Sequence, residues 1–488
     1  MENRHKRTFR RLVKEIVLTT INAKWIHPSL ALRLLKANLG SDLIDSCEIL
    51  EFALRQPLAE KLESIRAANP LILGVSVSIW NHQATIELLK SLEIKPIVVL
   101  GGPEVSFLPE DSEIFLYAEY IIRGEGETAF RLLCEKLLAG EKEVNKFINA
   151  ENTDICKIKT AYHLYTDEDI AKKLIYVESS RGCVFNCEFC LSAVKTSGMH
   201  CIREFPLEPF FAEMDILIKR GVRTFKFLDR SFNINIKRSI QIIEFFLKKI
   251  NSFLKPSSSL ASSASLRLGE EFSSNYSSSL FTVHFEMVPS LFPSELLEAL
   301  SRFPPDTLRL EIGIQTLNRE AAARIGRLTD PKKELETLHY LSEKTNAIIH
   351  ADLIAGLPGE DIESFGRGFD QLWSALGNRN AEIQLGILKL LPGAPIKRHS
   401  EKYGMQYNPL PPYEIIETSM MNVDELKRIK NFARFWDIII GKNLIEFNKD
   451  EPVFDKFMKL SDDLFAHFGK NWGIDRAELL KIAVKTSI

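Results

Sequence analysis

The stretch Arg181-Gly-Cys-Val-Phe-Asn-Cys-Glu-Phe-Cys190 is the most informative part of this 488-residue chain. Its cysteines, Cys183, Cys187 and Cys190, are close enough in sequence for one short loop to aim three thiolates at one point. Iron–sulfur clusters are held by cysteine thiolates, and a four-iron cluster takes four ligands. A loop with three cysteines therefore predicts a 4Fe-4S cluster with one open iron, where a substrate or cofactor could bind.

Two other readings of the same cysteines remain open at this point. Structural zinc could be bound by the three cysteines with Cys201 or His200 as a fourth ligand. Zinc ligands usually come as two separated pairs, however, and here three crowd into eight positions. A redox pair of Cys187 and Cys190 would leave Cys183 without a role.

Composition restricts the class of protein. Hydrophobic residues make up 45% and charged residues 26%, as in ordinary globular proteins, and the length suggests two to four domains. The net charge of -2 gives no electrostatic reason to expect a nucleic-acid partner. No apolar run approaches the roughly 18 residues of a spanning helix, so no membrane span is expected. Seven cysteines, three of them clustered, fit a reducing, cytoplasmic location better than a disulfide framework.

Residues 14–142 alternate strand-like and helix-like segments, with strands expected at 15–20, 47–52, 71–78, 96–100 and 120–123. This order predicts a doubly wound parallel sheet. Such sheets bind ligands beyond the carboxyl ends of their strands, where Asn22, Ser76, Gly101 and Gly124 would lie.

The polar stretch at 143–172 is expected to be a linker. A second β/α series is expected at 173–399. Strands are expected at 174–178, 224–229, 281–286, 307–313, 347–352 and 382–386, which predicts a partial or full (β/α)6 barrel. Its notable polar residues sit at strand carboxyl ends, the functional face of barrel enzymes. The serine-rich segment 256–279 reads as a disordered insertion. Residues 400–488 are expected to form a mostly helical C-terminal domain. Its aromatic residues are expected to pack in a core, with a role in covering the substrate as the alternative; they are Phe432, Phe435, Trp436, Phe465 and Trp472.

Several segments together resemble the radical S-adenosylmethionine (radical SAM) core. They are Cys183–Cys190, Phe227–Asn233, His284–Pro289, Leu310–Gln315, Asp352–Glu360 and Leu388–Gly393. In that family the open iron chelates the amino and carboxylate groups of S-adenosylmethionine. The resemblance implies that S-adenosylmethionine is held by a set of residues from these segments: Phe189, Asp229, Glu286, Glu311, Gln315 and Asp352.

The N-terminal segments narrow the resemblance to cobalamin-binding radical SAM proteins that carry an uncharacterised helical C-terminal domain. The matching segments are Ile21–Leu32, Ser76–Asn81, Leu100–Ser106 and Arg123–Glu127. The resemblance implies a cobalamin pocket at the carboxyl edge of the first sheet. Its expected residues are Asn22, Trp25, His27, Ser76, Ser78, Trp80, Asn81, Gly101, Gly102, Pro103, Glu104, Gly124 and Glu125. Among them, the tryptophans would supply apolar walls and the glycines a close approach to the flat corrin ring.

Gly124-Glu-Gly-Glu-Thr-Ala129 also resembles a dinucleotide fingerprint. That fingerprint belongs to the first βα turn, whereas this segment follows the last strand. Glu125 and Glu127 would also repel a pyrophosphate at a helix N-terminus that favours anions. A nicotinamide or flavin site is therefore not expected here.

The expected function is a cobalamin-dependent radical SAM methyltransferase that acts on an unactivated centre of a small molecule or peptide. The expected electron donor is a flavodoxin or ferredoxin. The first alternative keeps both cofactors but rearranges or cyclises its substrate without methyl transfer. A methylthiotransferase would need a second cysteine triad in the N-terminal domain, where Cys47, Cys134 and Cys156 are scattered. A non-catalytic metal-binding module predicts zinc and no turnover of S-adenosylmethionine.

Overall fold

The computed structural model describes residues 15–194, 201–254, 281–327, 330–377, 381–441, 444–445 and 447–486. The described chain forms two compact units. The first comprises residues up to Val177 together with 203–222, and the second comprises 178–194, 201–202 and the residues from Arg223 onward. The basic N-terminal stretch and the serine-rich segment 256–279 lie outside the described residues.

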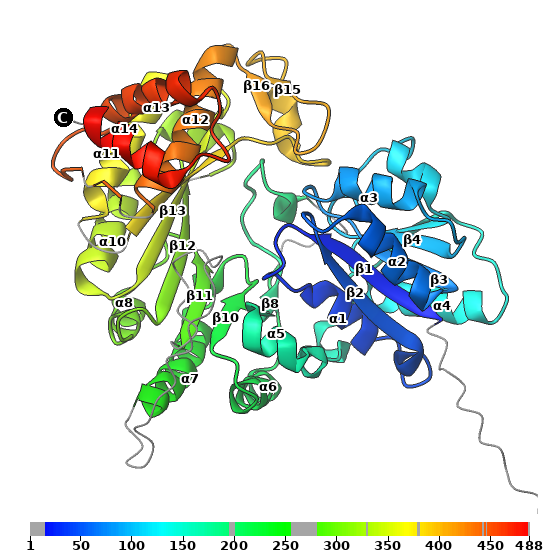
Figure 1. The fold of residues 1–488 in the computed structure, drawn as a ribbon. Helices are drawn as coiled ribbons and strands as arrows, with labels where there is room; N and C mark the ends of the chain where they lie inside the picture. Colours follow the sequence, from blue (N-terminus) through cyan, green and yellow to red (C-terminus); the bar gives the residue numbers. More distant parts are fainter. Residues whose placement is uncertain are drawn as a thin grey trace, which may run out of the picture. The chain divides into compact units, whose positions relative to one another are not determined.

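The sheet of the first unit is parallel throughout, in the order β2-β1-β3-β4-β5-β6. Figure 1 shows it in blue and cyan. Its strands are β1 (Ile16–Asn22), β2 (Cys47–Ala53), β3 (Ile72–Ser76), β4 (Ile97–Gly101), β5 (Tyr120–Arg123) and β6 (Phe147–Asn149). Strand β6 lies in the stretch predicted as a linker, where three residues between polar neighbours carry too little periodicity to be recognised.

Helices cover both faces of this sheet because its strands are apolar on both sides. One face carries Val17 and Ile21 and packs against α2 (Leu58–Ala68) and α3 (His82–Lys90). The other face carries Ile16 and Leu18 and packs against α1 (Leu30–Ala37) and α4 (Gly126–Leu138). The hydroxyl of Ser29 accepts a hydrogen bond from the Leu32 amide and caps α1.

Further elements of the first unit follow the sheet. They are α5 (Asp167–Lys172), β7 (Ile175–Val177), β9 (Arg203–Glu204) and α6 (Leu207–Lys219). The side chain of Arg33 on α1 lies 2.8 Å from carboxylate oxygens of both Glu51 on β2 and Asp169 on α5. Since all three side chains are buried, the ion-pair network fixes α5 to the sheet.

The second unit contains parallel strands in the order β14-β13-β12-β11-β10. They are β10 (Thr224–Phe227), β11 (Thr282–Met287), β12 (Leu308–Gln315), β13 (Ile348–Ala355) and β14 (Ala381–Ile387). The helices between them are α7 (Ile236–Leu254), α8 (Ser294–Ser301), α9 (Arg319–Arg324), α10 (Pro331–Lys344) and α11 (Ile362–Ala375). The short strand β8 (Ser180–Arg181) precedes the cysteine loop.

The C-terminal region contains a hairpin of β15 (Gln406–Tyr407) and β16 (Ile415–Glu417), followed by α12 (Val423–Ile439), α13 (Phe454–Phe468) and α14 (Arg476–Thr486). Phe432 and Trp436 of α12 pack edge-on against Phe369 of α11, which confirms core packing for them. Trp472 differs, since it is 72% exposed. The predicted fold class is confirmed: two parallel α/β sheets and a helical C-terminal region (Figure 1).

None of the helices in the described part of the chain is long and apolar enough to cross a bilayer.

Candidate active site

Backbone hydrogen bonds hold the cysteine loop at its centre. The Glu188 amide donates to the Ile325 carbonyl at 2.9 Å, and the Glu188 carbonyl accepts from the Ile396 amide at 3.0 Å. The Glu188 carboxylate is buried and lies 2.9 Å from His399 Nε2 and from Arg398 Nε. Contacts from two separate segments therefore fix the residue between Cys187 and Cys190.

Gly326 allows the segment after α9 to lie against this loop. Its φ is +71°, and a Cβ atom there would meet the Asn186 carbonyl oxygen at 2.6 Å. Any L side chain at this position would push the two segments apart. The glycine thus brings the next residue, Arg327, to the cysteines.

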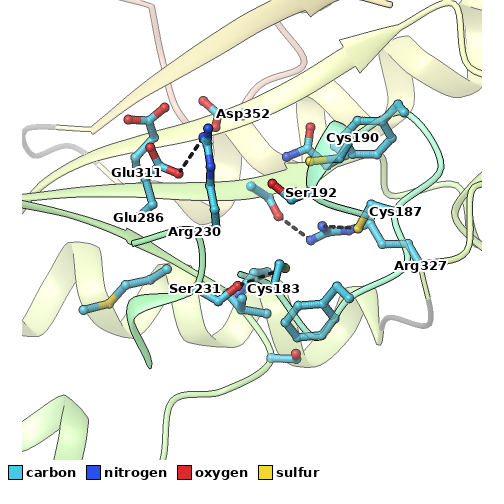
Figure 2. A pocket seen from close by; sticks show the side chains of 18 of the residues that line it. Cys183, Cys187, Cys190, Ser192, Arg230, Ser231, Glu286, Glu311, Arg327 and Asp352 are labelled. Atoms are coloured by element: carbon cyan, nitrogen blue, oxygen red, sulfur yellow. Dashed lines mark hydrogen bonds and ion pairs between the residues drawn. The ribbon is translucent and has the colours of Figure 1, made fainter. Parts of the chain in front are cut away.

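The loop forms one side of a cavity of about 200 Å³. Figure 2 shows the three cysteines on one side and the carboxylates of Glu286, Glu311 and Asp352 on the other. Of the residues predicted to bind the cluster and S-adenosylmethionine, eight line this cavity: Cys183, Cys187, Cys190, Phe189, Glu286, Glu311, Gln315 and Asp352.

The donor set fits a cluster. Among the described residues, no three Cys, His, Asp or Glu side chains converge on a point that a single metal ion could occupy. A four-iron cluster needs no such point, because each of its thiolates binds a different iron. Burial raises the pKa of the Cys187 thiol, and nearby Arg327 opposes that rise by favouring the thiolate.

Three of the carboxyl groups that line the cavity, those of Glu286, Glu311 and Asp352, have shifted pKa values. Glu286 and Glu311 lie opposite each other in the register of the neighbouring strands β11 and β12. The carboxylate of Glu311 lies 3.2 Å from His284 Nε2 and 3.3 Å from Lys226 Nζ. These partners, His284 foremost, hold the pKa of Glu311 at about 2. Burial, together with the charges of Glu311 and Glu286, raises the pKa of Asp352 to about 8. Burial likewise raises the pKa of Glu286.

Asp229 is the exception among the predicted S-adenosylmethionine ligands. It is not among the residues that line the cavity. Its buried carboxylate accepts hydrogen bonds from the Ser179 amide at 2.9 Å, the Ser179 hydroxyl at 2.6 Å and the Ser180 hydroxyl at 2.7 Å. The structure therefore gives Asp229 a role in holding the start of the cysteine loop.

Sequence reasoning missed several cavity residues. Ser231 places its hydroxyl 3.5 Å from Cys183 Sγ, and Arg230 lies 3.8 Å from the Glu286 carboxylate. Arg327 reaches Cys187, and Glu334 of α10, whose charge interacts with that of Arg327, also lines the cavity. Ser231 and Arg230 follow Asp229 directly, so the strand-end rule could have included them. Arg327 and Glu334 belong to no motif. For Arg327 the one sequence signal is the Gly326-Arg327 pair after a helix, and Glu334 has none.

A second candidate site lies at the carboxyl edge of the first unit's sheet. Trp25 and Trp80 follow the adjacent strands β1 and β3 and remain 44% and 50% exposed. Pro103 is also exposed, and Ser76 and Gly101 are half-buried. His27, half-buried, places Nδ1 2.9 Å from the Tyr176 hydroxyl. Exposed, rigid aromatic surface beside small residues suits a broad, flat ligand.

Other residues predicted for this edge are used inside the fold. Asn81 is fully buried and bonds the Ser78 amide and the Ile21 carbonyl. Buried Glu104 pairs with His82 Nδ1 at 2.8 Å. Asn22 donates to the Glu51 carboxylate at 3.1 Å.

The loop glycines at this edge also differ in environment. Gly102 has a φ of +106°, and its Cβ would meet the Val77 carbonyl oxygen at 2.5 Å, so its small size serves loop packing. Gly101 is open, with its nearest neighbour 3.8 Å from a built Cβ. Gly124 has a φ of +92°, and the carboxylate of Glu125 binds Arg203 of the same unit.

Comparison with known proteins gives two domain families. The B12 binding domain matches residues 16–134, and the Radical SAM superfamily matches residues 177–372. Both the predicted resemblance and the predicted cofactors are confirmed at the level of these domains.

Curated relatives include an uncharacterized methyltransferase, PH0819, of Pyrococcus horikoshii, 29% identical over 36% of this chain and 43% of that protein. The cobalamin-dependent radical SAM methyltransferase TokK of Streptomyces tokunonensis is 22% identical over 72% of this chain and 52% of that protein. The chain thus spans about half the length of the curated relatives it matches.

Two solved structures share the fold. The radical S-adenosylmethionine methyltransferase TsrM of Kitasatospora setae, with tryptophan substrate and a SAM analog bound, gives a TM-score of 0.58 at 16% identity, covering 84% of this chain and 80% of that one. The cobalamin-dependent radical enzyme OxsB gives 0.61 at 14% identity, covering 96% and 78%.

Proposed function

We propose that this chain, which carries a B12-binding domain followed by a radical SAM domain, is a cobalamin-dependent radical SAM methyltransferase. The observation that carries the proposal is the cavity in which three thiols face the carboxyl groups of Glu286, Glu311 and Asp352, which lie on adjacent strands of one sheet. The names of the curated relatives support methyl transfer over other radical reactions.

When bound, the cluster would supply one electron for cleavage of S-adenosylmethionine, and cobalamin would supply a methyl carrier. Cys183, Cys187 and Cys190 would hold the cluster and leave one iron open. The loop contacts of Glu188 keep the thiols in place before the cluster is assembled. Little reorganisation is then required on binding.

The cavity carboxyl groups would orient the zwitterionic sulfonium ligand through their different charges. Glu311 is ionised at neutral pH and offers a fixed negative charge to a ligand ammonium group. Asp352 keeps its proton up to a pH of about 8, so it can donate a hydrogen bond to a ligand carboxylate or ribose oxygen. Phe189 and Gln315 would contact the adenine and ribose from the rim of the same cavity.

In the first unit, we propose that Trp25, Trp80, Ser76 and Gly101 contact cobalamin, with His27 as a polar neighbour. Their exposure at one sheet edge supports this assignment. Asn22, Asn81, Glu104, Gly102 and Glu125 would support that edge through the internal contacts described above, without touching the cofactor. A small-molecule substrate and a flavodoxin or ferredoxin as electron donor complete the proposal.

Product analysis tests this function. Full-length protein, reconstituted anaerobically with iron, sulfide and cobalamin, should convert S-adenosylmethionine to 5′-deoxyadenosine under reducing conditions. With substrate present, S-adenosylhomocysteine should appear along with a methylated product. 5′-Deoxyadenosine without any S-adenosylhomocysteine would overturn methyl transfer and favour a rearrangement or cyclisation.

A further inference from the structure

Arg327 is the one charged side chain, among the described residues, with a hydrogen bond to a cysteine of the predicted cluster site. Its Nη1 atom lies 3.8 Å from Cys187 Sγ, and Nη2 donates to the Gly313 carbonyl of β12. Figure 2 shows the guanidinium reaching across to Cys187. The planar fork therefore bridges the cysteine loop and a strand, and it has one fixed orientation.

The surroundings keep this positive charge directed at the sulfur. Arg327 lines the cavity and follows Gly326, whose backbone packs on the cysteine loop. Glu334, the acidic side chain on α10 near Arg327, is fully buried, and neither of its oxygens meets a hydrogen-bond donor among the described residues. Glu334 is thus near enough to Arg327 to feel its charge, but no hydrogen bond between the described residues turns the guanidinium away from the sulfur.

The other two cysteines have different surroundings. Ser231 offers Cys183 a neutral hydroxyl at 3.5 Å. The described contacts of Cys190 include a backbone hydrogen bond from its amide to the Cys187 carbonyl. Among the described residues the site is thus asymmetric, since the cationic hydrogen-bond donor lies at Cys187.

We propose that Arg327 is a positioning residue that raises the reduction potential of the cluster through its hydrogen bond and charge at Cys187 Sγ. Reduction adds negative charge to a cluster, and hydrogen bonds and positive charge at its sulfurs stabilise that charge. The inference rests on the proposed function, because it assumes a cluster on the three cysteines. It adds to that function a residue that determines how readily the electron is accepted.

The test compares the full chain with Arg327→Gln, Arg327→Lys and the control Arg324→Gln. Arg324 lies three residues earlier, loses the same charge on substitution and bonds the Pro358 and Gly359 carbonyls outside the cavity. Each protein is reconstituted with iron and sulfide, iron is counted, and the midpoint potential is measured by electron paramagnetic resonance during a redox titration.

Arg327→Gln should bind as much iron as the wild type and shift the midpoint potential to a more negative value. The midpoint potential of Arg327→Lys should lie between those of the wild type and Arg327→Gln. Lysine keeps the positive charge but cannot donate hydrogen bonds to Cys187 and to the Gly313 carbonyl at the same time. Arg324→Gln should match the wild type. A wild-type potential in iron-loaded Arg327→Gln would overturn the inference. If Arg327→Gln does not bind iron, a wild-type potential in Arg327→Lys would overturn it.

The same experiment separates this inference from the proposed function. Wild-type protein that binds no cluster would refute the function itself. Wild-type protein that binds a cluster, with no shift in the Arg327 variants, would refute only the role of Arg327.

Discussion

Glu311 and Asp352 line one cavity from the adjacent strands β12 and β13, yet their pKa values are about 2 and about 8. His284 and Lys226 stabilise the charge on Glu311, and that charge in turn disfavours ionisation of buried Asp352. Two carboxyl groups that would have similar pKa values in water thereby differ at pH 7, where Glu311 is an anion and Asp352 is a neutral acid.

The first prediction is a pH dependence of stability. The folded pKa of Asp352 lies above the unfolded value of about 3.9, so between pH about 4 and about 8 the carboxyl ionises in the unfolded state but not in the folded state, and stability falls as pH rises. The free energy of unfolding, measured with urea, should therefore favour Asp352→Asn over the wild type by more at pH 8.5 than at pH 5.

Glu311 should show the opposite sign. Its folded pKa is lowered, so its contribution is present above a pH of about 4.3 and is lost as pH falls toward 2. Glu311→Gln should cost about 2 kcal/mol at pH 7 and roughly half of that at pH 3. Equal costs at both pH values would show that the charge of Glu311 is not stabilised by its neighbours.

The second prediction concerns Asp229, which is buried against Ser179 and Ser180. Asp229→Ala should destabilise the protein by about 3 kcal/mol, because it leaves these donors unsatisfied. Urea unfolding measures the loss. An unchanged stability, with weakened S-adenosylmethionine binding in a titration, would restore Asp229 as a ligand.

The third prediction contrasts two neighbouring glycines. Gly102→Ala should cost about 2 kcal/mol or more, because it places a Cβ against the Val77 carbonyl at a positive φ. Gly101→Ala should fold normally but bind cobalamin more weakly, since an added Cβ would fit at 3.8 Å from the Ile122 carbonyl oxygen but would keep the corrin ring away from the backbone. Thermal unfolding and a cobalamin titration followed by absorbance distinguish the two. Normal cobalamin binding by Gly101→Ala would exclude a close approach there.

The fourth prediction tests the exposed tryptophans. Trp25→Ala and Trp80→Ala should each weaken cobalamin binding about tenfold, which corresponds to about 1.4 kcal/mol. Trp472→Ala is the matched control, because Trp472 is 72% exposed in the C-terminal region. Wild-type affinity for cobalamin in both Trp25→Ala and Trp80→Ala would place the cofactor elsewhere.

The elements and the cavity could be predicted because their signals are local. Strand apolarity places Glu286, Glu311 and Asp352 on strands of one sheet, and cysteine spacing places the loop. The expected position at strand ends was wrong for Glu311 and Asp352, because β12 and β13 continue past them to Gln315 and Ala355. The use of each polar side chain could not be predicted, since it depends on neighbours distant in sequence. Asp229 and Asn81 have the right residue types at the right strand ends, yet internal hydrogen bonds occupy both. Arg327 reaches Cys187 because the chain returns to the cysteine loop after α9, and the only sequence signal for that return is the Gly326-Arg327 pair itself.

The central claim is that Cys183, Cys187 and Cys190 hold a four-iron cluster, and iron content after anaerobic reconstitution tests it most directly. Wild type and Cys156→Ala, which alters an exposed cysteine of the first unit, should each bind about four irons per chain, and the triple alanine variant of the loop should bind almost none. Iron binding that survives loss of the three cysteines, or zinc in place of iron in the wild type, would contradict the account.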